Sequence, residues 1–197
     1  MLTLAFDTAT SVATSALVRD GEVVAERASR AVRVLADADE LLTAAGAQPR
    51  DLTAVVAGTG PGSFTGLRIG LAAARTLAFA LELPLAGVST LEALAAGAPG
   101  AVPVIDAGRR EVFSVVEGIP VVLSPHELQV ESGATCVGDG AVRYREPLQA
   151  RGAVVPPRES ELHLPRARFH AQLAREFTDP DAVEPLYLRL PDAEQPR

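Results

Sequence analysis

Residues 54–81, AVVAGTGPGSFTGLRIGLAAARTLAFAL, decide the fold of this chain. An apolar run breaks here into a glycine-rich loop, and the loop opens a long apolar segment with helical spacing. This order directs backbone N–H groups and the positive end of a helix toward one point. Such a point holds an anion or offers a tight surface to a partner.

Two well-known phosphate loops do not match this stretch. A Walker loop needs a lysine beside its last glycine, whereas Gly66 is followed by Leu67 and Arg68. The glycines Gly60, Gly62 and Gly66 read G-x-G-x-x-x-G, which is one residue longer than the dinucleotide fingerprint. The loop is therefore specific, but for neither of these nucleotide-binding folds.

The segments on either side of the loop predict an α/β fold. Alternating apolar residues predict strands over residues 2–7, 13–18 and 22–26, and Asp20-Gly21 is a strong signal for a two-residue hairpin between the last two. The order then expected is a helix over 35–45, a strand over 52–57, the loop with its helix over 63–80, a strand over 84–88 and a helix from residue 90. Three antiparallel strands followed by alternating helix and strand indicate a ribonuclease-H-like layout.

A second unit is expected after the segment GAPGAVP at residues 97–103. We therefore predict an N-terminal ribonuclease-H-like subdomain over 1–98 and a shortened C-terminal subdomain over 99–197. The patterns of the second subdomain predict a strand–turn–strand unit over 102–116, strands near Val121 and Cys136, helices over 141–150 and 162–177, and an extended tail over 187–190.

The composition and charge of the chain limit the kinds of protein that it can be. An apolar fraction of 48% in 197 residues supplies a sizeable core. The long helix carries Arg68 and Arg75, which a membrane span tolerates poorly, and no leader pattern precedes residue 20, so we expect a cytoplasmic protein without membrane contact. The formal charge is −7, which argues against independent binding to a nucleic acid. The lone Cys136 is expected to be a small buried side chain.

Side chains for catalysis are scarce. The three histidines, His126, His163 and His170, include no i, i+4 pair of the kind that helical metal sites use. Ser63 does not lie in a G-x-S-x-G elbow and is expected to cap the following helix instead. The chain contains no lysine, which excludes Schiff-base chemistry. We therefore expect no catalytic residue, no metal and no cofactor.

The helix over 63–80 has two apolar faces. One ridge carries almost no side chain, because Gly66, Gly70, Ala74 and Ala78 recur every four residues, so that another element can approach closely. Phe64, Leu67, Leu71 and Leu81 form a bulkier neighbouring stripe. Both faces pack against the protein's own sheet, or one of them is left for a partner.

Five motifs, in order along the chain, resemble the bacterial TsaB (YeaZ-type) family: FDTAT at 6–10, GTGPGSFTGLRIG at 58–70, GVSTLEAL at 87–94, IDAGRREVF at 105–113 and EPLYLRLP at 184–191. The resemblance implies an actin-like ATPase fold of two related halves. It also implies a non-catalytic scaffold that dimerises with a catalytic relative, TsaD, beside a small ATPase, TsaE, in the threonylcarbamoyladenosine (t6A) modification of tRNA position 37. Contact with tRNA would then be indirect, and a homodimer is an open alternative. The competing hypothesis is an independent actin-like ATPase or kinase, or a glycoprotease-like peptidase.

The resemblance also places the expected sites. The helices over 63–80 and 35–45 would bind the partner, through Ser63, Phe64, Gly66, Leu67, Arg68, Gly70, Leu71, Ala74, Arg75 and Ala78. Actin-like ATPases hold a carboxylate at the end of the first strand, which implies a vestigial phosphate site at Asp7, Thr8, Gly60, Gly62 and Asp106. Alternatively, Asp7 and Asp106 cap turns and bind backbone amides.

Overall fold

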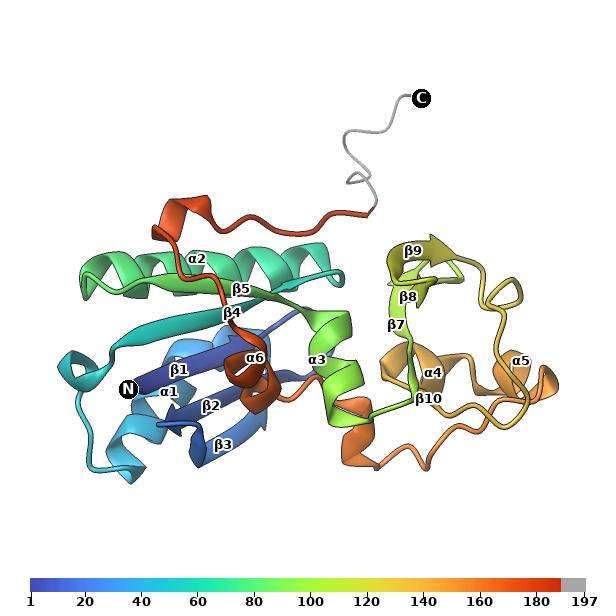
Figure 1. Cartoon of the computed structure of the whole chain (residues 1–197), viewed down its shortest axis with the longest axis horizontal. Helices are drawn as coiled ribbons and strands as arrows, with labels where there is room; N and C mark the ends of the chain where they lie inside the picture. The colour runs from blue at the N-terminus through green and yellow to red at the C-terminus, as the bar shows by residue number, and fades with distance from the viewer. Residues whose placement is uncertain (189–197) are drawn as a thin grey trace.

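The computed structural model describes residues 1–188 and has two lobes (Figure 1). The first lobe is built on a five-stranded sheet of order β3-β2-β1-β4-β5. The first three strands are antiparallel, and β4 and β5 run parallel to β1. This order confirms the predicted ribonuclease-H-like layout, with strands β1 (Leu2–Asp7), β2 (Ala13–Arg19), β3 (Glu22–Ser29), β4 (Ala54–Gly60) and β5 (Leu85–Ser89).

The hairpin between β2 and β3 forms where Asp20-Gly21 predicts it. Asp20 and Gly21 have φ angles of 50° and 89°, the left-handed region that a two-residue hairpin of this kind requires. All six residues of β1 are buried, because both faces of the strand are covered. Leu2, Leu4 and Phe6 lie in one apolar cluster, and Ala5 lies in another across the sheet.

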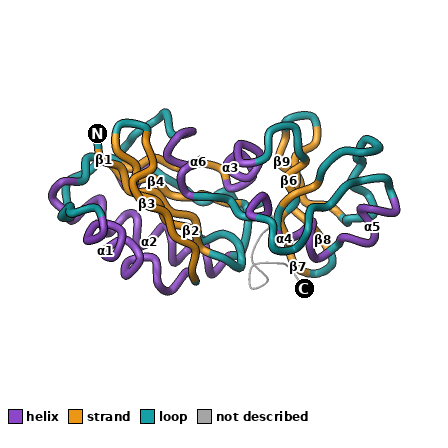
Figure 2. Tube along the Cα trace, turned by 90° about the horizontal axis from the view of Figure 1, so that it is seen from below, coloured by secondary structure: helices purple, strands orange, loops and turns teal. Residues whose placement is uncertain are grey.

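Helices cover both faces of this sheet. α1 (Val34–Ala44) and α2 (Phe64–Ala80) lie on one side, and α6 (Ala167–Leu173) lies on the other beside α3 (Thr90–Gly97), as Figure 2 shows. The three N-terminal helices form where the sequence predicts them. Ser63 caps α2 as expected, because its Oγ accepts a hydrogen bond from the backbone N–H of Gly66 at 3.2 Å.

The second lobe contains two small sheets and two short helices. In one sheet β7, β8 and β9 are antiparallel, and in the other β10 pairs in parallel with β6. The single helix predicted over 141–150 is two helices that break at Tyr144. The elements are β6 (Val102–Pro103), β7 (Ile105–Gly108), β8 (Glu111–Val116), β9 (Ile119–Leu123), β10 (Cys136–Val137), α4 (Asp139–Arg143) and α5 (Arg145–Ala150).

The last predicted helix is wrong in extent. Only Ala167–Leu173 of the predicted 162–177 is α-helical, and Glu161–His163 is a separate 3-10 turn. Pro165 explains the break, because a proline disfavours helical backbone in the residue before it and lacks an N–H for the helix ladder. α6 is also held from its start, since Glu26 of β3 pairs with Arg166 and Arg168.

After α6 the chain runs along the first lobe toward the second, where Leu188 packs against the apolar cluster that includes Ile105 and Phe113. Residues 178–188, here called the C-terminal segment, begin with a bridge between Thr178 and Leu85 and reach the end of β4, where Leu186 N–H donates to Thr59 C=O at 2.8 Å (Figure 1). The predicted division at residue 98 stays a prediction. The end of the expected tail over 187–190, and of the motif over 184–191, lies outside the described residues.

Two other expectations concern chemistry and membranes. Cys136 is fully buried, as expected, and burial raises the pKa of its thiol to about 11. Among residues 1–188, no helix combines the length and apolarity that a membrane crossing needs.

Candidate functional site

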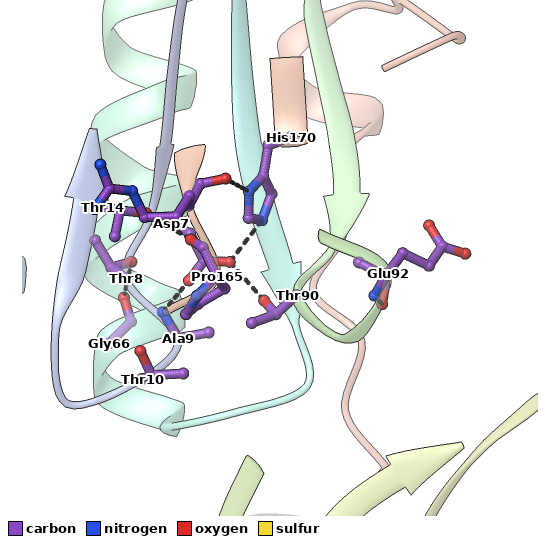
Figure 3. Close-up of polar contacts among 12 residues, drawn as sticks. Asp7, Thr8, Ala9, Thr10, Thr14, Gly66, Thr90, Glu92, Pro165 and His170 are labelled. Carbon is purple, nitrogen blue, oxygen red and sulfur yellow. Dashed lines mark hydrogen bonds and ion pairs between the residues drawn. The ribbon is translucent and has the colours of Figure 1, made fainter. Parts of the chain in front are cut away.

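The carboxylate of Asp7 lies at the carboxyl end of β1 and is 1% exposed (Figure 3). Its Oδ1 accepts a hydrogen bond from the backbone N–H of Ala9 at 2.7 Å, which is the turn-capping alternative. Its Oδ2 accepts a second from the hydroxyl of Thr90 at 2.6 Å and lies 2.8 Å from Nε2 of His170. All of these groups are buried, so both oxygens of Asp7 are engaged inside the protein.

His170 is the partner that the sequence did not reveal. It comes from α6, 163 positions after Asp7, and its side chain is fully buried. An ionised carboxylate only accepts hydrogen bonds, so with Asp7 ionised the Nε2 atom carries the proton. Thr90 and His170 contact the same oxygen of Asp7, so the hydroxyl group and the imidazole ring are both directed at this carboxylate. The arrangement joins β1, α3 and α6 and has no open side for a substrate.

The glycines of the motif let the loop and α2 pack against the turn after β1. A Cβ atom added at Gly62 would lie 2.3 Å from Ala9 C=O, and one added at Gly66 would lie 2.1 Å from Thr8 C=O. At Gly70 it would lie 2.1 Å from Oγ1 of Thr8, which itself donates to Gly66 C=O at 2.8 Å. The glycines are therefore required by contacts within the protein.

The residues predicted as a vestigial phosphate site lie in two different parts of the molecule. Asp7 and Thr8 lie at the turn after β1, where Gly62 approaches Ala9 C=O, and Gly60 lies beside Gly62 and Leu67. Asp106 lies in the second lobe, where its Oδ1 accepts from Gly108 N–H at 3.0 Å and its Oδ2 pairs with Arg143 at 2.5 Å. Asp106 thus also caps its own turn, in agreement with the structural alternative.

A cleft of about 600 Å³ opens between the two lobes. Its walls combine the turn before β2 with acidic and basic side chains of the second lobe. Asp139 accepts a hydrogen bond from Asp106 N–H at 3.0 Å, and burial raises the pKa of the Asp139 carboxyl above its ordinary value. The lining residues are Ser11, Val12, Asp106, Asp139, Val142, Arg143, Arg158, His163 and Leu164.

The predicted partner-binding residues fall on opposite sides of α2. The small-residue ridge faces inward, and six of the ten residues are buried: Gly66, Leu67, Gly70, Leu71, Ala74 and Ala78. Ser63 and Arg68 are exposed, and Phe64 and Arg75 are half-buried. The ridge is therefore filled by the protein's own turn and sheet, and only the outer side of α2 is open to a partner.

This outer side carries large exposed apolar groups. Phe79 at the end of α2 is 81% exposed, and Leu35 of α1 is 55% exposed. Val32, in the 3-10 turn Ala31–Arg33 before α1, is 77% exposed. α1 and α2 both cover the same face of the sheet, so the exposed side chains of the two helices lie on that side of the molecule (Figure 2).

Within residues 1–188, no group of three or more His, Cys, Asp or Glu side chains is arranged to hold a metal ion.

Known proteins resemble this chain along most of its length. A family model described as "TsaD: tRNA N6-adenosine threonylcarbamoyltransferase" matches residues 8–130. The Escherichia coli protein named tRNA threonylcarbamoyladenosine biosynthesis protein TsaB is 36% identical, and the match covers 96% of this chain and 95% of that protein. The protein of the same name from Bacillus subtilis is 38% identical over 58% of this chain and 54% of its own length.

A solved structure of a similar protein has the same fold over nearly the whole chain. YeaZ from Pseudomonas aeruginosa superposes with a TM-score of 0.78 at 29% identity, and covers 95% of this chain and 99% of that one. The likeness includes both lobes and confirms the predicted fold class.

Proposed function

Because this chain belongs to the TsaB (YeaZ) family of tRNA threonylcarbamoyladenosine biosynthesis proteins, we propose that it acts as the non-catalytic partner of a TsaD-type protein in the cytoplasm. In this role it binds the catalytic protein and supports its activity on tRNA position 37. The observation that carries the proposal is the outer side of α1 and α2, which carries large exposed apolar side chains beside charged ones and is covered by none of residues 1–188.

The closed surroundings of Asp7 support the non-catalytic part of the proposal. In a fold whose enzymes use a carboxylate at the end of the first strand, this carboxylate is enclosed by Ala9, Thr90 and His170. A group that is 1% exposed cannot contact a substrate without local opening of the fold. Catalytic groups for the modification therefore come from the partner.

The exposed apolar groups of α1 and α2 support a protein partner. Phe79, Leu35 and Val32 leave large apolar surfaces in water, and such groups on one side of a molecule mark interaction sites. Burial of apolar area contributes about 25 cal/mol per Å² before the costs of association, so these side chains can anchor an interface.

The net charge of the chain indicates how it takes part in contact with tRNA. A net charge of −7 opposes an anionic polymer, so contact with tRNA is made mainly by the TsaD-type protein. A TsaE-type ATPase joins the assembly, and in the absence of partners a second copy of this chain can cover the same exposed side.

The proposal is tested by mixing the purified chain with a TsaD-type protein and measuring the mass of the product by size-exclusion chromatography with light scattering. We expect a complex, and we expect tRNA modification to require both proteins. Absence of a complex, or turnover of Mg-ATP by this chain alone at an enzymatic rate, would refute the proposal.

A matched pair of variants locates the interface. Leu35→Asp places a charge on the exposed side of α1, and Val154→Asp places the same charge on a residue of the second lobe that is similarly exposed, 51% against 55%. Only Leu35→Asp should weaken the complex. If the two variants bind the TsaD-type protein with equal affinity, the interface does not include this side of α1.

A further inference from the structure

Arg68 is held in a defined position in the first turns of α2. Its guanidinium lies over the ring of Phe64, with 3.8 Å between its Cζ atom and the ring centroid. Phe64 is in turn packed against Tyr187, with ring centroids 5.3 Å apart and the rings tilted by 41°. A planar cation that stacks on an aromatic ring keeps its N–H groups at the edge, where they remain available to an acceptor.

No carboxylate of residues 1–188 uses these N–H groups. The ion pairs of the described chain involve other arginines, and Arg68 makes neither an ion pair nor a hydrogen bond among them. Arg75, seven residues further along α2, differs because its guanidinium donates to Val183 C=O at 2.5 Å. Arg68 is therefore exposed and stacked, and it makes no ion pair or hydrogen bond with residues 1–188.

The surroundings of Arg68 make this cation distinctive. The other exposed residues of α2 are uncharged: Thr65, Ala72, Thr76, Phe79 and Ala80. A partner that covers this side of α2 meets apolar and small groups with one fixed positive charge among them. Burying that charge unpaired would be costly, so a complementary surface must supply an anion opposite it.

Tyr187 connects this position to the end of the chain. It belongs to the C-terminal segment, which is fixed one residue earlier by the hydrogen bond from Leu186 N–H to Thr59 C=O. Tyr187 is 40% exposed, and its ring contacts the ring on which Arg68 stacks. The C-terminal segment thus holds Phe64 in place, and through Phe64 it holds Arg68.

We propose that Arg68, stacked on Phe64 and braced by Tyr187, is a recognition site for a carboxylate side chain of the TsaD-type partner. The proposal rests on the proposed function, because it assigns a specific contact to that interface. Arg68 makes the contact, and Tyr187 is a positioning residue. A guanidinium binds a carboxylate through two parallel N–H···O bonds, so the site selects the position and orientation of the partner as well as its charge.

The test measures the dissociation constant for the TsaD-type protein at several salt concentrations. Arg68→Glu should weaken binding by roughly 10- to 100-fold, since hydrogen bonds between charged groups are among the stronger ones. Arg68→Lys should bind with intermediate affinity, because lysine keeps the charge but not the planar fork. The matched control is Arg19→Glu, which changes the net charge equally at an exposed residue at the end of β2.

Tyr187 is tested by a double-mutant cycle. Tyr187→Ala should weaken binding and flatten its salt dependence, whereas Tyr187→Phe, which keeps the ring, should behave as the wild type. In combination with Arg68→Ala, Tyr187→Ala should have little additional effect, because both changes remove the same contact. Additive effects would overturn the positioning role, since a purely structural role of Tyr187 would not depend on Arg68.

Failure of this inference differs from failure of the proposed function. If the wild type binds the TsaD-type protein and Arg68→Glu binds equally well with the same salt dependence, the recognition site is overturned and the proposed function stands. If the wild type does not bind, both are overturned. If Arg68→Glu dissociates only a homodimer of this chain, the carboxylate belongs to a second copy and the assignment to TsaD is overturned. Melting temperatures of all variants verify that each one is folded.

Discussion

Gly70→Ala tests whether the small-residue ridge of α2 is part of the protein's own core. The added Cβ would lie 2.1 Å from Oγ1 of Thr8, whereas ordinary contacts begin at 3.4 Å, so α2 and the turn after β1 must separate by more than 1 Å. Thr8 cannot turn away freely, because it is 1% exposed and donates to Gly66 C=O.

The magnitude follows from three opposing effects. Overpacking of a tight core costs about 1–3 kcal/mol. Loss of the Thr8 hydrogen bond adds about 1 kcal/mol, and the better helix propensity of alanine returns about 1 kcal/mol. The net destabilisation is therefore about 1–3 kcal/mol. In a chain of this size each kcal/mol lowers the melting temperature by about 2–4 °C.

The assay is thermal unfolding of Gly70→Ala, Thr8→Ala and the double variant, beside a binding measurement with the TsaD-type protein. Thr8→Ala removes the clashing oxygen, so the double variant should be more stable than the sum of the single effects predicts. Folded Gly70→Ala should still bind the partner, because the ridge faces inward. An unchanged melting temperature together with lost binding would refute this reasoning and return the ridge to the interface.

Three further predictions concern buried groups. Asp7→Ala should lower the free energy of unfolding by about 3 kcal/mol or more, because Thr90 and His170 lose a buried acceptor; a loss near 1 kcal/mol in denaturant titration would show that Asp7 only caps its turn. Asp139→Asn should melt at a higher temperature than the wild type at pH 7, because the raised pKa of Asp139 means that folding disfavours its ionised form. The difference in melting temperature should shrink as the pH falls through that raised pKa toward 3.8. A constant difference across the pH range would contradict this effect. Cys136 should react with a thiol reagent only after unfolding, because it is buried with a pKa of about 11; rapid labelling of the native protein would disprove this.

Local signals predicted most of the first lobe. The apolar alternation of residues 2–7, the Asp20-Gly21 turn and the Ser63 cap each depend on a few neighbouring residues, and all three are confirmed. The glycine loop is distinctive for the same reason, since its motif lies within a few neighbouring residues. The sequence does not identify the segment that packs against the small-residue ridge of α2, because small side chains indicate only that another part of a protein approaches closely. The structure identifies that neighbour as the turn containing Thr8.

The contacts around Asp7 could not be predicted in this way. His170 is 163 positions away, on a helix that is shorter than its sequence pattern predicts because Pro165 interrupts the helical run. A single histidine on a short helix carries no periodic or motif signal. The sequence also does not predict that Arg68 is stacked and exposed, since its stacking depends on Phe64 and on Tyr187, which is far away in the sequence.

The contact between β1 and α6 has a consequence for synthesis and for fragment design. On the ribosome, β1 to β5 emerge long before residues 167–173, so the part of the central sheet that α6 covers stays exposed until those residues have been made. A recombinant fragment ending at residue 98 would expose Ala5, Val56 and Ala86 and leave Asp7 without His170. Such a fragment should aggregate or require a detergent, and adding residues 161–188 in trans should restore its solubility.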